Sequence, residues 1–313
     1  MTAGLPVSLA KADLAVSRNL ATSWRACLRA RGVGAMLLAV SCLAAMPGVA
    51  SAAAPAAVPI TIGETRLVTF ADGDVRQVNV YLPDGYAKDD KRYPVLYLID
   101  GGLSQDFLHV AGTTALGAVW GRSEPAIVVG IESRDRRAEL IGSPGNAAQH
   151  EQYPTAGRSA AFRAFLRDKV KPMVEASYRT NGQDGVIGES LAGLFIVETW
   201  LREPGLFGRY AAIDASLWWD DGALSKAAPG VLAGGASRGP LYLTYSNEGP
   251  ETADAADRVA RAGSALVCLV PRPDLTHATA YHVLSPQALQ FLFPTANKQD
   301  PEWGFEVPCS RKS

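Results

Sequence analysis

The chain has 313 residues, of which 48% are hydrophobic and 19% charged, and its formal net charge at pH 7 is −1. A chain of this balance can bury a sizeable core, and its lack of a basic excess argues against nucleic acid as a partner. The length suits one large α/β domain or two small ones.

The first 52 residues have the pattern of a secretory leader. Basic side chains dominate residues 1–32, an apolar run follows at 33–46, and small residues at 50–52 provide a cleavage site. The apolar run is shorter than the roughly 20 residues of a membrane span. We therefore predict a signal peptide over 1–52, a linker over 53–59, no stable membrane span after leader removal, and a periplasmic or secreted location.

Residues 60–313 alternate between strand-like and helix-like stretches. Short apolar or alternating runs bounded by turn residues predict strands at 75–82, 93–99, 126–131, 185–188, 210–213, 241–245 and 265–270. Apolar residues at helical spacing predict a helix over 160–178 and further helices after the last two strands. A second helix is expected to follow the strand at 185–188 and to run through Trp200. This alternation indicates an α/β fold, with a mostly parallel central sheet and helices on both faces.

Two of the four cysteines remain once the leader is removed. Cys268 lies in a predicted buried strand, and Cys309 is close to the C-terminus. An oxidising compartment would permit them to pair, but their spacing alone leaves the pairing open. No histidine cluster accompanies them, so we expect neither a metal nor an organic cofactor.

The sequence GESLAG over residues 188–193 is the motif that carries chemistry. A predicted strand ends just before Ser190 and a helix begins just after it, which is the context of a nucleophile elbow. Ala192 stands where the G-x-S-x-G pattern has glycine, a departure of one methyl group. The alternative interpretation is an ordinary serine that caps a helix.

A serine hydroxyl needs a base, and histidine is the usual one. Only His277 and His282 follow Ser190, and His277 comes soon after the last strand, so we predict His277 as the base. Glu248, the first carboxylate after the penultimate strand, is the predicted acid of the triad. Asp274 and the group Glu251, Asp254 and Asp257 are rivals, and a Ser–His dyad is also allowed.

An oxyanion hole requires two backbone N–H groups. The residue after the nucleophile, Leu191, supplies one of them, and the glycine-rich turn after residue 99 would supply the second from Gly102. The alternative is that these glycines only reverse the chain.

At this point the chain resembles the esterase D-like esterases of the α/β-hydrolase superfamily, and most of all the bacterial siderophore esterases that open enterobactin-type trilactones. The resemblance covers about residues 60–295 and rests on YPVLYLIDG at 93–101, GESLAGLF at 188–195 and SLWWD at 216–220. It implies the α/β-hydrolase fold for the catalytic domain over 60–313, and it matches Ser190 and His277 to the family's catalytic positions. Asp214-Ala215 replaces the family's usual Ser-Pro, a departure that adds a carboxylate near the predicted cleft.

The same resemblance suggests where a substrate would bind. Trp218 and Trp219 offer flat apolar area that could stack on an aromatic acyl group, or they could simply pack a helix. Arg137, in the loop after the strand at 126–131, could bind an anionic substrate, and the segment 141–157 is a candidate lid or specificity loop.

The leading hypothesis is an exported serine hydrolase that cleaves carboxylic esters of small molecules through an acyl-enzyme. One alternative is an acyltransferase that uses the same nucleophile. A second alternative is a non-catalytic binding protein that keeps the α/β-hydrolase fold.

Overall fold

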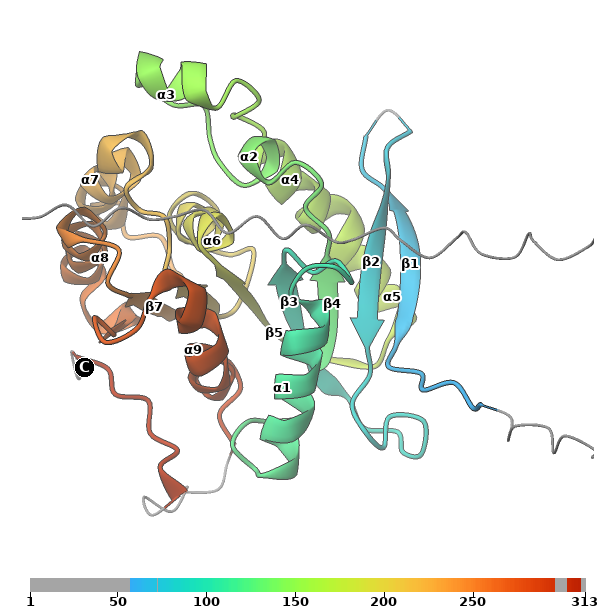
Figure 1. The fold of residues 1–313 in the computed structure, drawn as a ribbon. Coiled ribbons are helices and arrows are strands. Elements are labelled where there is room, and N and C mark those ends of the chain that lie inside the picture. The colour runs from blue at the N-terminus through green and yellow to red at the C-terminus, as the bar shows by residue number, and fades with distance from the viewer. Residues whose placement is uncertain (1–56, 72, 296–302, 311–313) are drawn as a thin grey trace, which may run out of the picture. The chain divides into compact units, whose positions relative to one another are not determined.

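The sheet is the element on which the rest of the chain is built (Figure 1). A computed structural model describes residues 57–71, 73–295 and 303–310. Its eight strands follow the order β1-β2-β4-β3-β5-β6-β7-β8. Their bounds are β1 Glu64–Thr69, β2 Val75–Tyr81, β3 Tyr93–Ile99, β4 Ile127–Ile131, β5 Thr180–Glu189, β6 Tyr210–Ile213, β7 Leu241–Tyr245 and β8 Val267–Pro271.

Strand direction follows from how the strands are connected. Strands β3 to β8 run parallel to one another, whereas β2 is antiparallel to both of its neighbours, β1 and β4, and β1 forms the edge of the sheet. Strands β3, β4 and β6 are buried along their whole length, as expected of strands covered on both faces. The carboxyl ends of β5, β6, β7 and β8 consequently lie next to one another at one edge.

Helices cover both faces of the sheet. Each face of the sheet has its own hydrophobic core, and successive side chains of β3 point into one core and then the other. Leu96 and Leu98 pack with α1 and α9, while Tyr97 and Ile99 pack with α4 and α6. Figure 1 shows α1 and α9 side by side. The helical bounds are α1 Phe107–Val119, α2 Arg136–Glu139, α3 Ala147–Gln152, α4 Ser159–Phe165, α5 Lys171–Ser177, α6 Leu191–Arg202, α7 Trp219–Ala233, α8 Pro250–Gly263 and α9 His277–Leu292.

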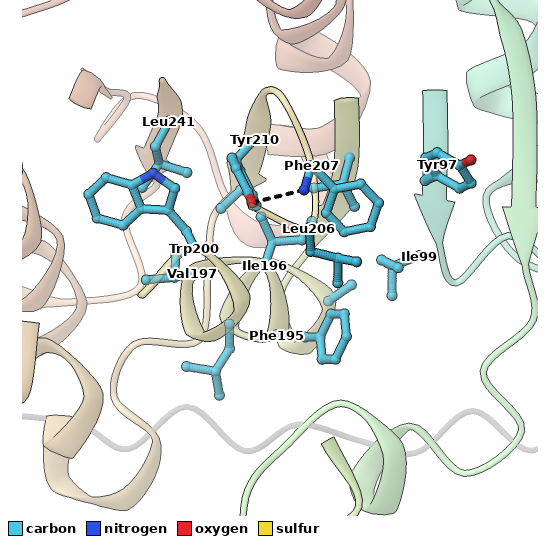
Figure 2. Close-up of a cluster of buried hydrophobic side chains, with 14 of the residues drawn as sticks. Tyr97, Ile99, Phe195, Ile196, Val197, Trp200, Leu206, Phe207, Tyr210 and Leu241 are labelled. Carbon is cyan, nitrogen blue, oxygen red and sulfur yellow. Dashed lines mark hydrogen bonds between the residues drawn. The ribbon is translucent and has the colours of Figure 1, made fainter. Parts of the chain in front are cut away.

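The larger core holds α6 against the sheet and so positions the start of that helix (Figure 2). Trp200 is fully buried, and its indole N–H donates to the Gly239 carbonyl at 2.9 Å. The Tyr210 hydroxyl accepts from the Phe207 amide at 3.1 Å and donates to the Pro204 carbonyl at 2.9 Å. The buried Tyr97 hydroxyl of the same cluster, in contrast, has no hydrogen-bond partner among the described residues. The packing of α6 against the sheet therefore helps to position Ser190, the residue that precedes the helix.

The predicted strands are present, with differences at their ends. Strand β1 and helices α1, α2, α3 and α7 were not predicted. Strand β1 is almost wholly exposed, so it has little apolar pattern to detect. The helix expected over 160–178 is interrupted by a π-helical turn at Leu166–Val170, which separates α4 from α5. Strand β5 begins five residues earlier than predicted because polar residues extend its exposed end.

Cys268 and Cys309 form a disulfide that fastens the C-terminal segment to β8. The amide of Ser310 also donates to the Leu269 carbonyl at 2.8 Å, so the segment covers part of the edge strand. Within the described residues, no helix has the length and apolar character needed to cross a membrane. The predicted leader lies outside the described residues.

Candidate active site

Ser190 occupies the corner between β5 and α6. Its backbone has φ 62° and ψ −120°, a left-handed value that a non-glycine residue adopts only where the surrounding structure enforces it. Small neighbours permit this corner, because a Cβ on Gly188 would lie 2.7 Å from the Ala192 Cβ and a Cβ on Gly193 would lie 3.0 Å from Ala215. The geometry is that of a nucleophile elbow.

Strand β6 and the residues after it hold the corner from the other side. The Ser190 amide donates to the Ile213 carbonyl at 3.1 Å, and the Ser216 amide donates to the Ser190 carbonyl at 3.0 Å. Among the described residues, the side-chain partner of Ser190 Oγ is the hydroxyl of Ser216, at 3.3 Å. We did not single out Ser216 as a site residue, although it opens the SLWWD segment.

His277 is the first residue of α9. Thr276 caps this helix through a reciprocal hydrogen-bond pair with Thr279, which fixes where the helix begins. The His277 Nδ1 atom lies 2.7 Å from Asp214 Oδ2 and 3.2 Å from Glu248 Oε1. Two carboxylates therefore face the same ring nitrogen.

Asp214 follows β6 directly and was expected only as a nearby carboxylate. It is fully buried, and it accepts hydrogen bonds from the Ser246 amide and the Ser246 hydroxyl, both at 2.6 Å. Burial alone would raise the pKa of Asp214, but the hydrogen bonds from His277 and Ser246 outweigh it, so the pKa is lowered. Asp214 is therefore ionised at neutral pH.

The acids that face His277 favour its protonated form. The hydrogen bond with Asp214 raises the pKa of His277 despite partial burial, and the negative charges of Glu248 and Glu189 act in the same direction. Burial raises the pKa of Glu248 itself, and the neighbouring Asp214 charge adds to this, while His277 opposes it. The histidine is thus an electrostatically supported proton acceptor.

Glu189 joins the nucleophile corner to the histidine helix. It directly precedes Ser190, and its Oε1 accepts from the amide of Tyr281 in α9 at 3.1 Å. His277 and Tyr281 lie one turn apart in α9, so this bond holds the helix start beside Ser190. Among the described residues, Ser190 Oγ is hydrogen-bonded to Ser216 and His277 to Asp214.

The two predicted oxyanion donors differ in their surroundings. Leu191 is the first residue of α6, where amides are not used by the helix. The Gly102 amide donates to Gln105 Oε1 at 2.9 Å, while the Gln105 amide donates to the Gly102 carbonyl at 3.0 Å. This reciprocal pair resembles a capping box, and Gln105 would have to release the Gly102 amide before it could bind an oxyanion.

The predicted substrate contacts divide into buried and accessible groups. Trp219 is 6% exposed and packs edge-on against Tyr153, so its ring fills the core and is not free to stack on a ligand. Trp218 is half-buried and borders a cavity of about 440 Å³ together with Lys226 and Arg258. The exposed Arg137 guanidinium lies over the Tyr153 ring, 5.1 Å from its centre.

The candidate lid segment is tied to the start of α7. Asp220 Oδ1 accepts from the amides of Gly145 and Asn146, both at 2.9 Å, and the Asp220 amide donates to Gln149. The lid role itself stays a prediction.

The rival acids lie elsewhere. Asp274 pairs with Arg272 at 2.7 Å, and Glu251, Asp254 and Asp257 belong to α8. Asp214, Glu248 and His277 offer donor atoms within 4.8 Å of one another, the only such trio among the described residues that could hold a metal ion. The hydrogen bonds that Asp214 already accepts account for this cluster without an ion.

Sheet order, helix placement and the serine corner together define an α/β-hydrolase fold. The chain belongs to the family described as "Putative esterase", whose profile matches residues 71–257. This confirms the family expected from the sequence.

Individual proteins show the same likeness. Uncharacterized protein YbbA of Bacillus subtilis is 25% identical over 50% of this chain and 64% of its own length. Ferri-bacillibactin esterase BesA of the same organism is 28% identical over 41% of this chain and 49% of its own. The chain therefore spans less than two thirds of either relative. An IroE-like serine hydrolase from Shewanella oneidensis shares the fold, with a TM-score of 0.65, 23% identity, and 74% and 80% of the two chains covered.

Proposed function

We propose that the protein hydrolyses carboxylic esters through an acyl-enzyme formed on Ser190. The observation that carries this proposal is the strained Ser190 corner beside a histidine whose Nδ1 is bonded to a buried, ionised carboxylate. Membership of an esterase family supports it.

The reaction would proceed in two balanced halves. His277 Nε2 accepts the Ser190 hydroxyl proton as Oγ bonds to the ester carbonyl carbon, and the same proton then passes to the leaving alcohol. Water, which gives a proton to His277, next attacks the acyl carbon. The bond from that carbon to Ser190 Oγ then breaks, and the same proton passes from His277 to Oγ, which releases the acid and restores the Ser190 hydroxyl. The amides of Leu191 and Gly102 would stabilise the oxyanion in both halves, once Gln105 has released the Gly102 amide.

A fluorophosphonate probe tests the nucleophile. We expect the wild type to be labelled, and Ser190→Ala to lose both the label and at least about a thousandfold of its esterase kcat, because no other group can form the acyl-enzyme. Ser177→Ala, a change to an exposed serine at the end of α5, is the matched control and should be labelled like the wild type. Unchanged labelling of Ser190→Ala would reject the proposal.

For the substrate we propose a siderophore trilactone. BesA carries the name of a ferri-bacillibactin esterase, and the half-buried Trp218 offers a ring on which an aromatic acyl group could stack. The comparison of interest is kcat/KM for an enterobactin-type trilactone against simple p-nitrophenyl esters. Turnover of the simple esters without trilactone opening would reject this substrate and leave the esterase proposal intact.

A further inference from the structure

Two carboxylates from neighbouring strand ends face one imidazole nitrogen. Asp214 follows β6 and Glu248 lies three residues beyond β7, and these strands are adjacent in the sheet. The Nδ1–H group has a single proton, which can form one strong hydrogen bond. The two acids therefore cannot have the same role.

Asp214 is the better placed of the two. Its contact with Nδ1 is a hydrogen bond of 2.7 Å, and its side chain has no exposed surface. Its backbone is also fixed, with φ 44° and an amide that donates to Thr244 Oγ1 at 2.9 Å. Together with the two bonds from Ser246, these contacts leave the carboxylate one orientation.

Glu248 is held less firmly. Its side chain is 24% exposed, and it lies 3.2 Å from Nδ1 as an ion pair rather than a hydrogen bond. The loop that carries it is tied to the loop before His277, because the Asn247 amide donates to the Leu275 carbonyl at 3.0 Å. Glu248 thus stays near the ring without fixing its orientation.

We propose that Asp214 is the positioning residue that fixes the His277 tautomer, and that Glu248 is an auxiliary negative charge beside it. This assignment rests on the proposed function, and it replaces Glu248 as the acid that the order of strands favoured. Glu189, which accepts from the Tyr281 amide in the same helix, is the third acid whose charge acts on His277.

Three single variants test the assignment by kcat and by the pH dependence of kcat/KM on a p-nitrophenyl ester. Asp214→Asn should lower kcat by about 10³–10⁴-fold, because an amide no longer holds the imidazole in the productive tautomer. Glu248→Gln should lower kcat less than about tenfold. It should also move the acid limb to lower pH, because a charge that raises the pKa of His277 is lost. Asp274→Asn, whose partner is Arg272, is the control and should match the wild type.

The outcomes separate this inference from the proposed function. A loss in Glu248→Gln equal to or larger than that in Asp214→Asn would overturn the assignment while fluorophosphonate labelling of Ser190 still supports the esterase. If the acid limb of the pH profile of kcat/KM does not move in Glu248→Gln, the auxiliary role of Glu248 is overturned. If wild-type Ser190 takes no label, the proposed function fails first.

A second measurement covers the case in which Asp214→Asn fails to fold. Proton NMR of the wild type should show a strongly downfield Nδ1–H resonance, which follows from a hydrogen bond to an ionised carboxylate. Glu248→Gln should keep this resonance. Its loss in folded Glu248→Gln would assign the bond to Glu248 and overturn the proposal.

Discussion

At the residue scale, the corner at Ser190 depends on a pair of small side chains. Ala192 is fully buried, and its methyl group occupies the space that a side chain on residue 188 would need. The alanine is therefore compatible with the elbow only because residue 188 is glycine. Ala192, which departs from the G-x-S-x-G pattern, therefore helps to pack α6 onto β5.

This packing predicts the effect of adding one methyl group. Gly188→Ala should lower the free energy of unfolding by about 1–3 kcal/mol, because its Cβ would lie 2.7 Å from that of Ala192. It should also slow the labelling of Ser190, which the corner positions. Ala192→Gly creates no close contact, should lower the free energy of unfolding by about 1 kcal/mol through helix propensity, and should still be labelled. Urea unfolding and labelling rates measure both, and equal stability of Gly188→Ala and wild type would contradict the prediction.

Glu189 makes stability depend on pH. Burial raises the pKa of Glu189 from 4.5 to about 7, and the charges of Asp106 and Asp214 add to this while His277 opposes it. The folded state therefore keeps a proton that the unfolded state loses, so this residue's contribution to stability is full below pH 4.5 and is lost as pH rises to about 7.

Glu189→Gln removes the charge and keeps the acceptor for the Tyr281 amide. We expect it to be more stable than the wild type by about 1–3 kcal/mol at pH 8 and nearly equal at pH 4.5, as measured by urea unfolding. Glu251→Gln, at an exposed position in α8, is the control. An equal stability difference at both pH values would show that the effect is packing and not charge.

At the scale of elements, parallel strands assemble the site. The carboxyl ends of β5, β6, β7 and β8 lie in sequence along the sheet, and they are followed by Ser190, Asp214, Glu248 and His277. Residues that are up to 87 positions apart along the chain come to the same edge of the sheet because each one follows a strand of the same direction. Strand β8 closes this end of the sheet, and the disulfide holds the C-terminal segment over its edge.

The disulfide should contribute strongly to stability. Cys268 and Cys309 are 41 positions apart, and closing a loop of this length restricts the unfolded chain by about 4 kcal/mol. Cys309→Ser should therefore unfold at a lower urea concentration, with kcat unchanged at 25 °C because neither cysteine contacts the catalytic residues. A reductant should shift the wild type to the same midpoint and leave the variant unaffected. A wild type insensitive to reductant would contradict the pairing.

At the scale of the whole molecule, residues Pro59–Ser313 make up one compact unit, and this unit contains every site residue. We expect export to remove residues 1–52, so that N-terminal sequencing of the exported protein should begin at Ala53. A chain that starts at Ala53 should be labelled by fluorophosphonate as fast as the full chain. Slower labelling or misfolding of the shorter chain would show that the leader contributes to the fold.

Local patterns were enough to predict much of this protein. The alternation of apolar runs and helical spacing indicated the sheet and its helices, because secondary structure depends on residues within a few positions of each other. The strand–serine–helix context indicated Ser190, and the requirement that the base follow it left His277 as the better of two histidines. The edge strand β1 was missed because it is exposed along almost its whole length and so has no apolar periodicity.

Only the tertiary structure decided which groups meet at the ring and around it. Asp214 and Glu248 are equally good acids as residue types, and strand order favoured Glu248. The distance from each carboxylate to Nδ1 depends on the loop path after β6 and β7 and on the bonds from Ser246. The pairing of Cys268 with Cys309 and the bond from Gly102 to Gln105 were settled in the same way. Sequence patterns record what each residue can do, whereas contacts between distant loops depend on backbone geometry that such patterns do not contain.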